Sequence, residues 1–207
     1  WLAFATFVRR RAANQDLDPD ATARWLAKAL ELYPADERFH LAVERLLPTG
    51  ASGERLAVLT RAYAEVPSAR VACRFAMAHN DAGDHARAAA LYATAEEWEV
   101  EDSGEETVIA AIRALRVEQL IRAGDGRGAL ALAQAIMDVH APLTGPRARL
   151  AAACATGDAE LVSSHGTAFI AAIESQPDIS EDGLLWDEVT YLNGPTWMDG
   201  EHSLDSP

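Results

Sequence analysis

The sequence predicts an all-α protein made of antiparallel helix hairpins. Apolar residues recur at helical spacing, most clearly at Ala88, Leu91, Tyr92 and Ala95, which occupy positions i, i+3, i+4 and i+7. Glycine or proline interrupts these runs at short intervals, and no alternating apolar–polar run is long enough to indicate a strand. Two apolar runs separated by such a break are typical of two helices that fold back on each other.

The breaks are nearly periodic. Pro34 and Pro67 lie 33 residues apart, and Gly124 and Gly157 have the same separation. A period near 33 residues built from helix pairs is typical of an α-solenoid, in which each hairpin buries its apolar stripe against its neighbours. We therefore expect a right-handed α-solenoid of about five hairpins, covering residues 1–34, 35–67, 68–102, 103–143 and 144–175.

The first two hairpins are bounded by prolines. A helix over residues 1–13 is followed by one that begins at Pro19 and is closed by Pro34. Proline suits the first turn of a helix, where its missing N–H is not needed, and it cannot continue a helix that has already formed. Helices over residues 35–47 and 53–66 are expected to form the second hairpin.

The third hairpin, residues 68–102, has the clearest pattern. Ser68 is an N-cap candidate, because its hydroxyl can accept a hydrogen bond from the first turn of a helix. The pair Gly83-Asp84 then breaks the apolar pattern between two helices of similar length. We expect the second of these helices to end near Trp98 and residues 99–102 to form an acidic connector that lengthens this period.

The fourth and fifth hairpins follow the same plan. Ser103 and Glu106 have the spacing of a capping box, in which the two side chains bond the free N–H groups of a helix start. Gly124-Asp125 and Gly157-Asp158 provide the turns. We expect helices over residues 105–123, 127–140, 144–156 and 159–174.

These hairpins resemble tetratricopeptide repeats, which pair two helices and place small residues where their backbones cross. The first helix also resembles the related half-a-tetratricopeptide repeats, through the stretch Trp1-Leu2-Ala3-Phe4-Ala5. The resemblance covers residues 1–175 and implies a stack of helix pairs, and it supports this fold more than any particular function. The last hairpin departs furthest, with Gly166 where a large apolar residue is expected. The matching residues are Gly83, Asp84, Ala88, Tyr92 and Ala95 in the third hairpin and Gly124, Asp125, Ala129, Ala133 and Ile136 in the fourth.

Composition and charge argue against nucleic acid as a direct partner. The chain of 207 residues carries a net charge of −14, whereas binding to phosphates needs a basic surface. No run approaches the roughly 18 continuous apolar residues of a membrane-spanning helix, so we expect no membrane contact. The cysteines, Cys73 and Cys154, have no metal-type spacing, and we expect buried, reduced thiols in a cytoplasmic protein.

No residue pattern indicates catalysis, a cofactor or a metal, and we expect a protein that is not an enzyme. Residues 124–128 are rich in glycine but lack the preceding strand and the Lys-Ser/Thr pair of phosphate-binding loops. We expect them to form a repeat turn. Asp199, Glu201 and His202 are metal-ligand types that lie close together, but no second group with matching spacing accompanies them.

The candidate binding residues lie on the first helix of each hairpin, which would line the concave groove of a solenoid. Arginine can bind a carboxylate through two parallel hydrogen bonds, and asparagine can bind a peptide backbone. An ordinary solvated face of charged residues is the alternative interpretation. The candidate groove residues are Arg9, Arg70, Met77, Asn80, Glu118, Arg122 and Arg147.

Residues 176–207 form an acidic and aromatic C-terminal extension. From Pro177 onward the chain contains eight acidic residues and no lysine or arginine. A short helix is predicted over residues 180–192. We expect the extension to pack against the repeats and cap the open end of the stack; a free tail that binds another protein, or that self-associates, is the alternative. The apolar residues that distinguish it from a solubilising tail are Leu184, Leu185, Trp186, Val189, Tyr191, Leu192, Trp197 and Met198.

The sequence therefore predicts a protein–protein interaction or scaffold module that holds a protein or peptide segment in its concave groove. Because the sequence begins at Trp1 rather than at methionine, we expect it to be part of a longer protein. An accessory or regulatory domain of an enzyme whose catalytic part lies elsewhere is the main alternative. An RNA-processing scaffold is a further alternative, in which the acidic charge permits protein contacts but disfavours direct contact with RNA.

Overall fold

The computed structural model describes residues 19–47, 51–139 and 142–175. These ranges contain nine α-helices and no strand, so the all-α prediction is confirmed. The predicted helix over residues 1–13 and the C-terminal extension lie outside the described residues. The helices are α2 (Pro19–Leu32), α3 (Glu37–Leu46), α4 (Ser52–Glu65), α5 (Ala69–Asp81), α6 (His85–Asp102), α7 (Glu106–Arg122), α8 (Gly126–Gln134), α9 (Thr144–Thr156) and α10 (Ala159–Glu174).

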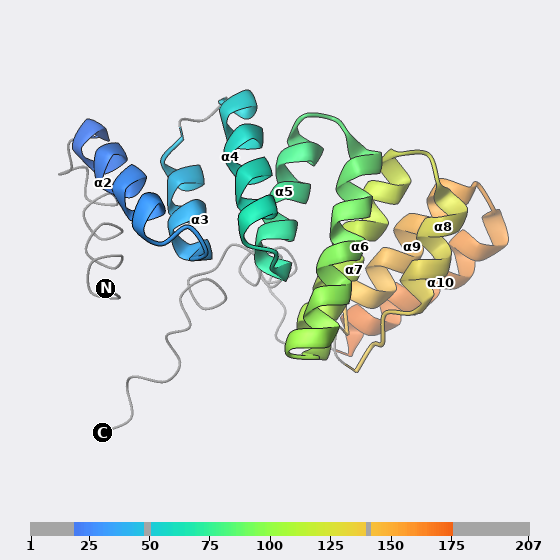
Figure 1. The fold of residues 1–207 in the computed structure, drawn as a ribbon. Helices are drawn as coiled ribbons and strands as arrows, with labels where there is room; N and C mark the ends of the chain where they lie inside the picture. The colour runs from blue at the N-terminus through green and yellow to red at the C-terminus, as the bar shows by residue number, and fades with distance from the viewer. Residues whose placement is uncertain (1–18, 48–50, 140–141, 176–207) are drawn as a thin grey trace, which may run out of the picture.

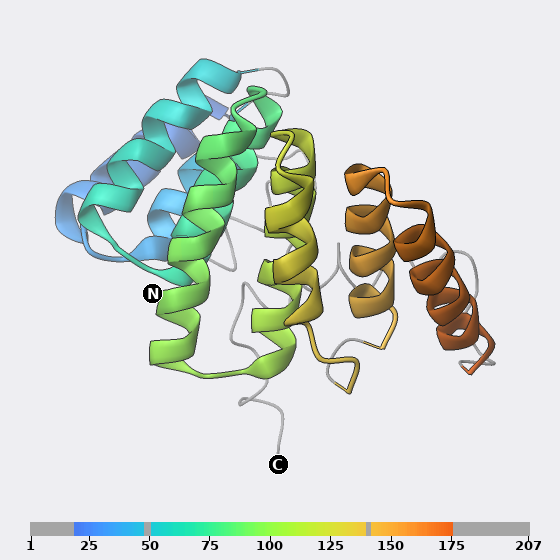
Figure 2. The same cartoon turned by 90° about the vertical axis from the view of Figure 1, so that its right-hand side faces the viewer.

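In Figure 1 the helices α2 to α5 stand side by side in chain order, and α6 to α10 continue this row away from α2. Each described helix packs against the next one, and α7 also packs against α9. The pairs α3–α4, α5–α6, α7–α8 and α9–α10 correspond to the last four predicted hairpins. Within these pairs, α3, α5, α7 and α9 are called the first helices and α4, α6, α8 and α10 the second helices. Figure 2 shows the α9–α10 pair at one end of the row.

Three of these pairs are closed by the same Gly-Asp turn. Gly83, Gly124 and Gly157 have φ angles of 79°, 84° and 74°, in the left-handed region that glycine adopts at little cost. The aspartate after each glycine is the N-cap of the second helix. Its side chain accepts a hydrogen bond from the backbone N–H three residues further on, at 2.9 to 3.2 Å. The turns predicted at these positions are confirmed.

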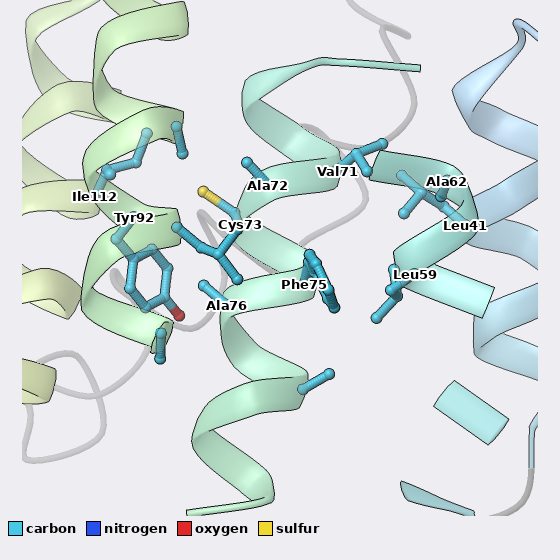
Figure 3. Close-up of a cluster of buried hydrophobic side chains, with 14 of the residues drawn as sticks. Leu41, Leu59, Ala62, Val71, Ala72, Cys73, Phe75, Ala76, Tyr92 and Ile112 are labelled. Carbon is cyan, nitrogen blue, oxygen red and sulfur yellow. The ribbon is translucent and has the colours of Figure 1, made fainter. Parts of the chain in front are cut away.

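The largest buried cluster surrounds α5 and is called the α5 cluster. Figure 3 shows Leu59 of α4 on one side of α5 and Tyr92 of α6 and Ile112 of α7 on the other. Ala72 and Ala76 of α5 are fully buried between these neighbours. Small side chains at such positions allow adjacent helices to pack closely.

The second helix of the third hairpin is longer than expected. α6 continues through Asp102, so the predicted acidic connector over residues 99–102 is wrong. Glu99 is on the buried side of this last turn and accepts a hydrogen bond from the hydroxyl of Ser103. Ser103 is therefore the C-cap of α6, and the predicted capping box with Glu106 is wrong as well.

The returning helix of the fourth hairpin is shorter than expected. α8 ends at Gln134 rather than near residue 140. Beyond this end, Arg113 of α7 donates a hydrogen bond to the carbonyl oxygen of Ala135 at 3.3 Å. Arg149 of α9 donates to the carbonyl oxygen of Ile136 at 3.1 Å. Arginines from two neighbouring helices thus satisfy carbonyl groups that a longer α8 would have bonded internally.

Candidate binding surface

The predicted groove residues are spread over three described helices. Arg9 lies outside the described residues. Arg70 lies near the start of α5 and Asn80 near its end, about 15 Å further along the helix axis. Arg147 is half-buried in the first turns of α9. Whether each residue is available to a binding partner therefore depends on its own neighbours.

Arg70 forms an ion pair between helices. Its Nη1 lies 2.6 Å from Oε1 of Glu37 on α3. The hydroxyl of Ser68, the N-cap of α5, donates to the other oxygen of the same carboxylate at 2.6 Å. This arrangement joins α3 to α5 and gives Arg70 a structural role within the array.

A more deeply buried ion pair joins the same region. The Glu44 side chain of α3 is only 3% exposed, and its oxygens lie 2.6 Å from Nη2 of Arg74 and 2.9 Å from Nε of Arg55. Arg74 is on α5 and Arg55 on α4, so three helices meet at one carboxylate. A buried charge is stable only when it is paired and hydrogen-bonded, and two guanidinium groups provide that pairing here.

Neither glutamate was predicted from the sequence, although a signal was present. Glu37 and Arg70 lie 33 residues apart, and Glu44 and Arg74 lie 30 apart. These separations are close to the hairpin period. Opposite charges one period apart occupy similar places on successive first helices, and such places are neighbours when the helices stack.

Three of the predicted residues come together between the C-terminal ends of α5 and α7. Arg122 donates from Nη1 to Oδ1 of Asn80 at 2.6 Å and from Nη2 to the carboxylate of Glu118, one turn earlier on α7. The side chains of Arg122 and Glu118 are 44% and 49% exposed. Met77, one turn before Asn80, packs partly buried against the α5 cluster. Met77, Asn80, Glu118 and Arg122 are called the α5–α7 surface.

The α5–α7 surface presents hydrogen-bond donors and acceptors together. A guanidinium group has five N–H donors in a planar fork, and two of its nitrogens are engaged by Asn80 and Glu118. These bonds hold Arg122 in one orientation. A fixed donor fork, a carboxylate and an amide beside the flexible, apolar Met77 suit the N–H and C=O groups of a peptide chain.

Two of the described histidines, His40 and His79, take part in packing. His40 is buried, and its Nε2 lies 2.7 Å from the carbonyl oxygen of Pro34. His79 lies against the ring of Phe75, with 4.7 Å between the ring centroids. In the described part of the chain, no three His, Cys, Asp or Glu side chains are grouped to hold a metal ion.

The two cysteines are free thiols in different environments. Cys73 is buried in the α5 cluster, and burial raises the pKa of its thiol, so it stays protonated at neutral pH. Cys154 is exposed on α9. The expectation that both thiols are buried is therefore wrong for Cys154, which lies on the side of α9 away from its buried alanines.

No family model, curated protein or solved structure matches this chain. Among the described helices, none combines the length and the apolar character needed to cross a membrane.

Proposed function

We propose that this protein is a protein–protein interaction module whose α5–α7 surface binds an extended segment of a partner protein. The observation that carries the proposal is the cluster of Asn80, Glu118 and Arg122. Glu118 and Arg122 are exposed, the cluster joins two successive first helices, and it lies beside the partly buried Met77. A peptide that crosses both helices would meet donors, acceptors and an apolar contact at one place.

The proposed partner is a protein or peptide and not a nucleic acid. A partner carboxylate could replace Glu118 on the guanidinium of Arg122, because arginine binds carboxylates in a bidentate geometry. Phosphate groups would be repelled by Glu118 and by the net charge of −14. We place this activity in the cytoplasm, where an exposed thiol such as that of Cys154 stays reduced.

The proposal includes a tetratricopeptide-like, right-handed solenoid as the architecture. Three equivalent Gly-Asp turns and the packing of each described helix on the next support it. Ala88 and Ala129 occupy the same position after their N-cap aspartates, and both are fully buried, as expected where paired helices cross. In such a solenoid α5 and α7 would lie side by side on the concave face.

The test is a quantitative pull-down with the full 207-residue chain and two charge-reversal variants. Arg122→Glu should lower the capture of a bound partner by about tenfold or more, because it places a carboxylate beside Glu118 where the donor fork stood. Arg87→Glu is the matched control. Arg87 is exposed on the second helix α6, outside the α5–α7 surface, and its reversal should leave capture unchanged.

A partner that is captured equally by the wild type and by Arg122→Glu would contradict the proposed site. Reversal of Arg70 is a poor test of binding. It would bring a carboxylate against Glu37 and would weaken the contact between α3 and α5.

A further inference from the structure

The last second helix, α10, differs from the others in how it is covered. Each of the other second helices packs against the helix that follows it in the chain: α4 against α5, α6 against α7 and α8 against α9. Each of these three second helices contains buried residues. α10 packs against α9 and contains no buried residue. Its large apolar residues are Leu161, Val162, Phe169, Ile170 and Ile173.

Counting from the N-cap aspartates matches the positions of α10 to those of α6. Ile170 is the twelfth residue after Asp158, and Glu96 is the twelfth after Asp84. Glu96 faces the next helix, because its carboxylate lies 2.7 Å from Nε of Arg113 on α7 and its side chain is 15% exposed. Ile170 holds the same position and is 57% exposed.

The helix α4 shows that this position faces the next helix in another pair too. Tyr63 is the twelfth residue after the N-cap Ala51. Its ring centroid lies 5.6 Å from that of Phe75 on α5. Ile170 is therefore at a position that the following helix contacts in two earlier pairs. Among the large apolar residues of α10 it is the exposed one, since Leu161, Val162, Phe169 and Ile173 are half-buried.

We propose that residues 180–192 of this chain form a helix that covers the surface of α10 around Ile170. In the earlier pairs the covering helix is always the next one along the chain. The connections are three residues from α4 to α5, three from α6 to α7 and nine from α8 to α9. α10 ends at Glu174, and the five residues 175–179 give a connection within that range.

The residues of this segment provide an apolar partner for Ile170. Leu185, Val189 and Leu192 have the spacing i, i+4 and i+7 of one helical face. On α6, an acidic residue at the twelfth position meets arginines of α7. On α10, an isoleucine stands there, and residues 177–207 contain no lysine or arginine but several large apolar residues. Compared with α6, α10 thus has an apolar residue in place of an acidic one, and the segment proposed to cover it has apolar residues in place of arginines.

The test is amide hydrogen exchange on the full 207-residue chain. In the wild type, amides of residues 180–192 should exchange at least about tenfold more slowly than in an unstructured peptide. Ile170→Asp should remove this protection, because it places a carboxylate in the apolar contact. Val100→Asp is the matched control: Val100 is 53% exposed on α6 and lies outside the proposed contact, so protection should persist.

The reciprocal variant Leu185→Asp should raise exchange in α10 about tenfold or more and leave exchange in α6 unchanged. It keeps the test decisive if Ile170→Asp unfolds α10 itself. Unprotected amides over residues 180–192 in the wild type would overturn the proposal, and so would a lack of effect from both variants. Protection that increases with protein concentration would also overturn it, because a second copy of the chain would then be the occupant.

Discussion

At the scale of single residues, arginine connects the helices of this array. Seventeen of the 18 basic residues are arginine, and a planar fork can bind two groups at once. Arg113 does so: its Nε lies 2.7 Å from the carboxylate of Glu96 on α6, and its Nη1 donates to the carbonyl oxygen of Ala135 after α8. One side chain on α7 therefore holds both neighbouring helices, which the single ammonium group of lysine would do less well.

The buried carboxylate of Glu44 gives the sharpest prediction at this scale. Glu44→Gln should lower the free energy of unfolding by roughly 3–5 kcal/mol, because it leaves Arg55 and Arg74 facing a neutral amide in a buried site. Urea denaturation followed by circular dichroism measures the change. Glu54→Gln, at an exposed position of α4, is the control and should leave the midpoint unchanged. A similarly small effect of both substitutions would show that the array does not need this ion pair.

The same residues show how far the site could be predicted from the sequence. The period and the helical pattern correctly placed Arg70 and Asn80 on one helix. They did not show how the two arginines differ. Glu37 neutralises Arg70, whereas Arg122 forms a hydrogen bond with Asn80 and stays exposed. That difference depends on which residue another hairpin brings to each place, so a pattern within one hairpin does not contain it.

At the scale of helices and turns, the helix ends that depend on a local turn sequence were predictable from the sequence. The helix ends that depend on tertiary contacts were not. The end of α9 and the start of α10 agree with the expected positions, because the Gly157-Asp158 turn lies between them. The end of α6 was missed, since it depends on the buried Glu99 and its bond to Ser103. The end of α8 was missed because arginines of α7 and α9 bond the carbonyl groups beyond it.

The Gly-Asp turn itself can be tested at Gly83. Gly83→Ala should destabilise the protein by about 1–2 kcal/mol, because an L residue is strained at a φ of 79°. No atom lies within 4 Å of the added Cβ, so the cost would be conformational and not steric. Thermal denaturation provides the measurement.

Gly53→Ala is the matched control for this prediction. Gly53 lies in the first turn of α4, its added Cβ also meets nothing within 4 Å, and its φ is not positive. Alanine should therefore be neutral there or stabilise the helix by up to about 1 kcal/mol. If both substitutions shifted the melting temperature alike, the left-handed conformation of Gly83 would not be the cause.

At the scale of the whole molecule, the buried side chains fall into separate clusters along the row. The α5 cluster lies between α3 and α7. A second group, called the α8 cluster, includes Val117, Ala129, Ile136 and Ala152 of the region from α7 to α9. If the helices form the proposed solenoid, those that depend mainly on their neighbours are expected to open locally, and not only by unfolding of the entire chain.

A core substitution in one cluster should therefore loosen its own helices and leave distant ones intact. Ile136 is 1% exposed in the α8 cluster, and Ile136→Ala should cost about 2–5 kcal/mol locally. Amide hydrogen exchange should then rise in α8, α9 and α10 while that in α4 and α5 stays unchanged. Leu59→Ala in the α5 cluster is the reciprocal control and should raise exchange in α4, α5 and α6 but not in α10. If either substitution raised exchange equally along the chain, the protein would unfold as one cooperative unit, and the predicted local opening would be wrong.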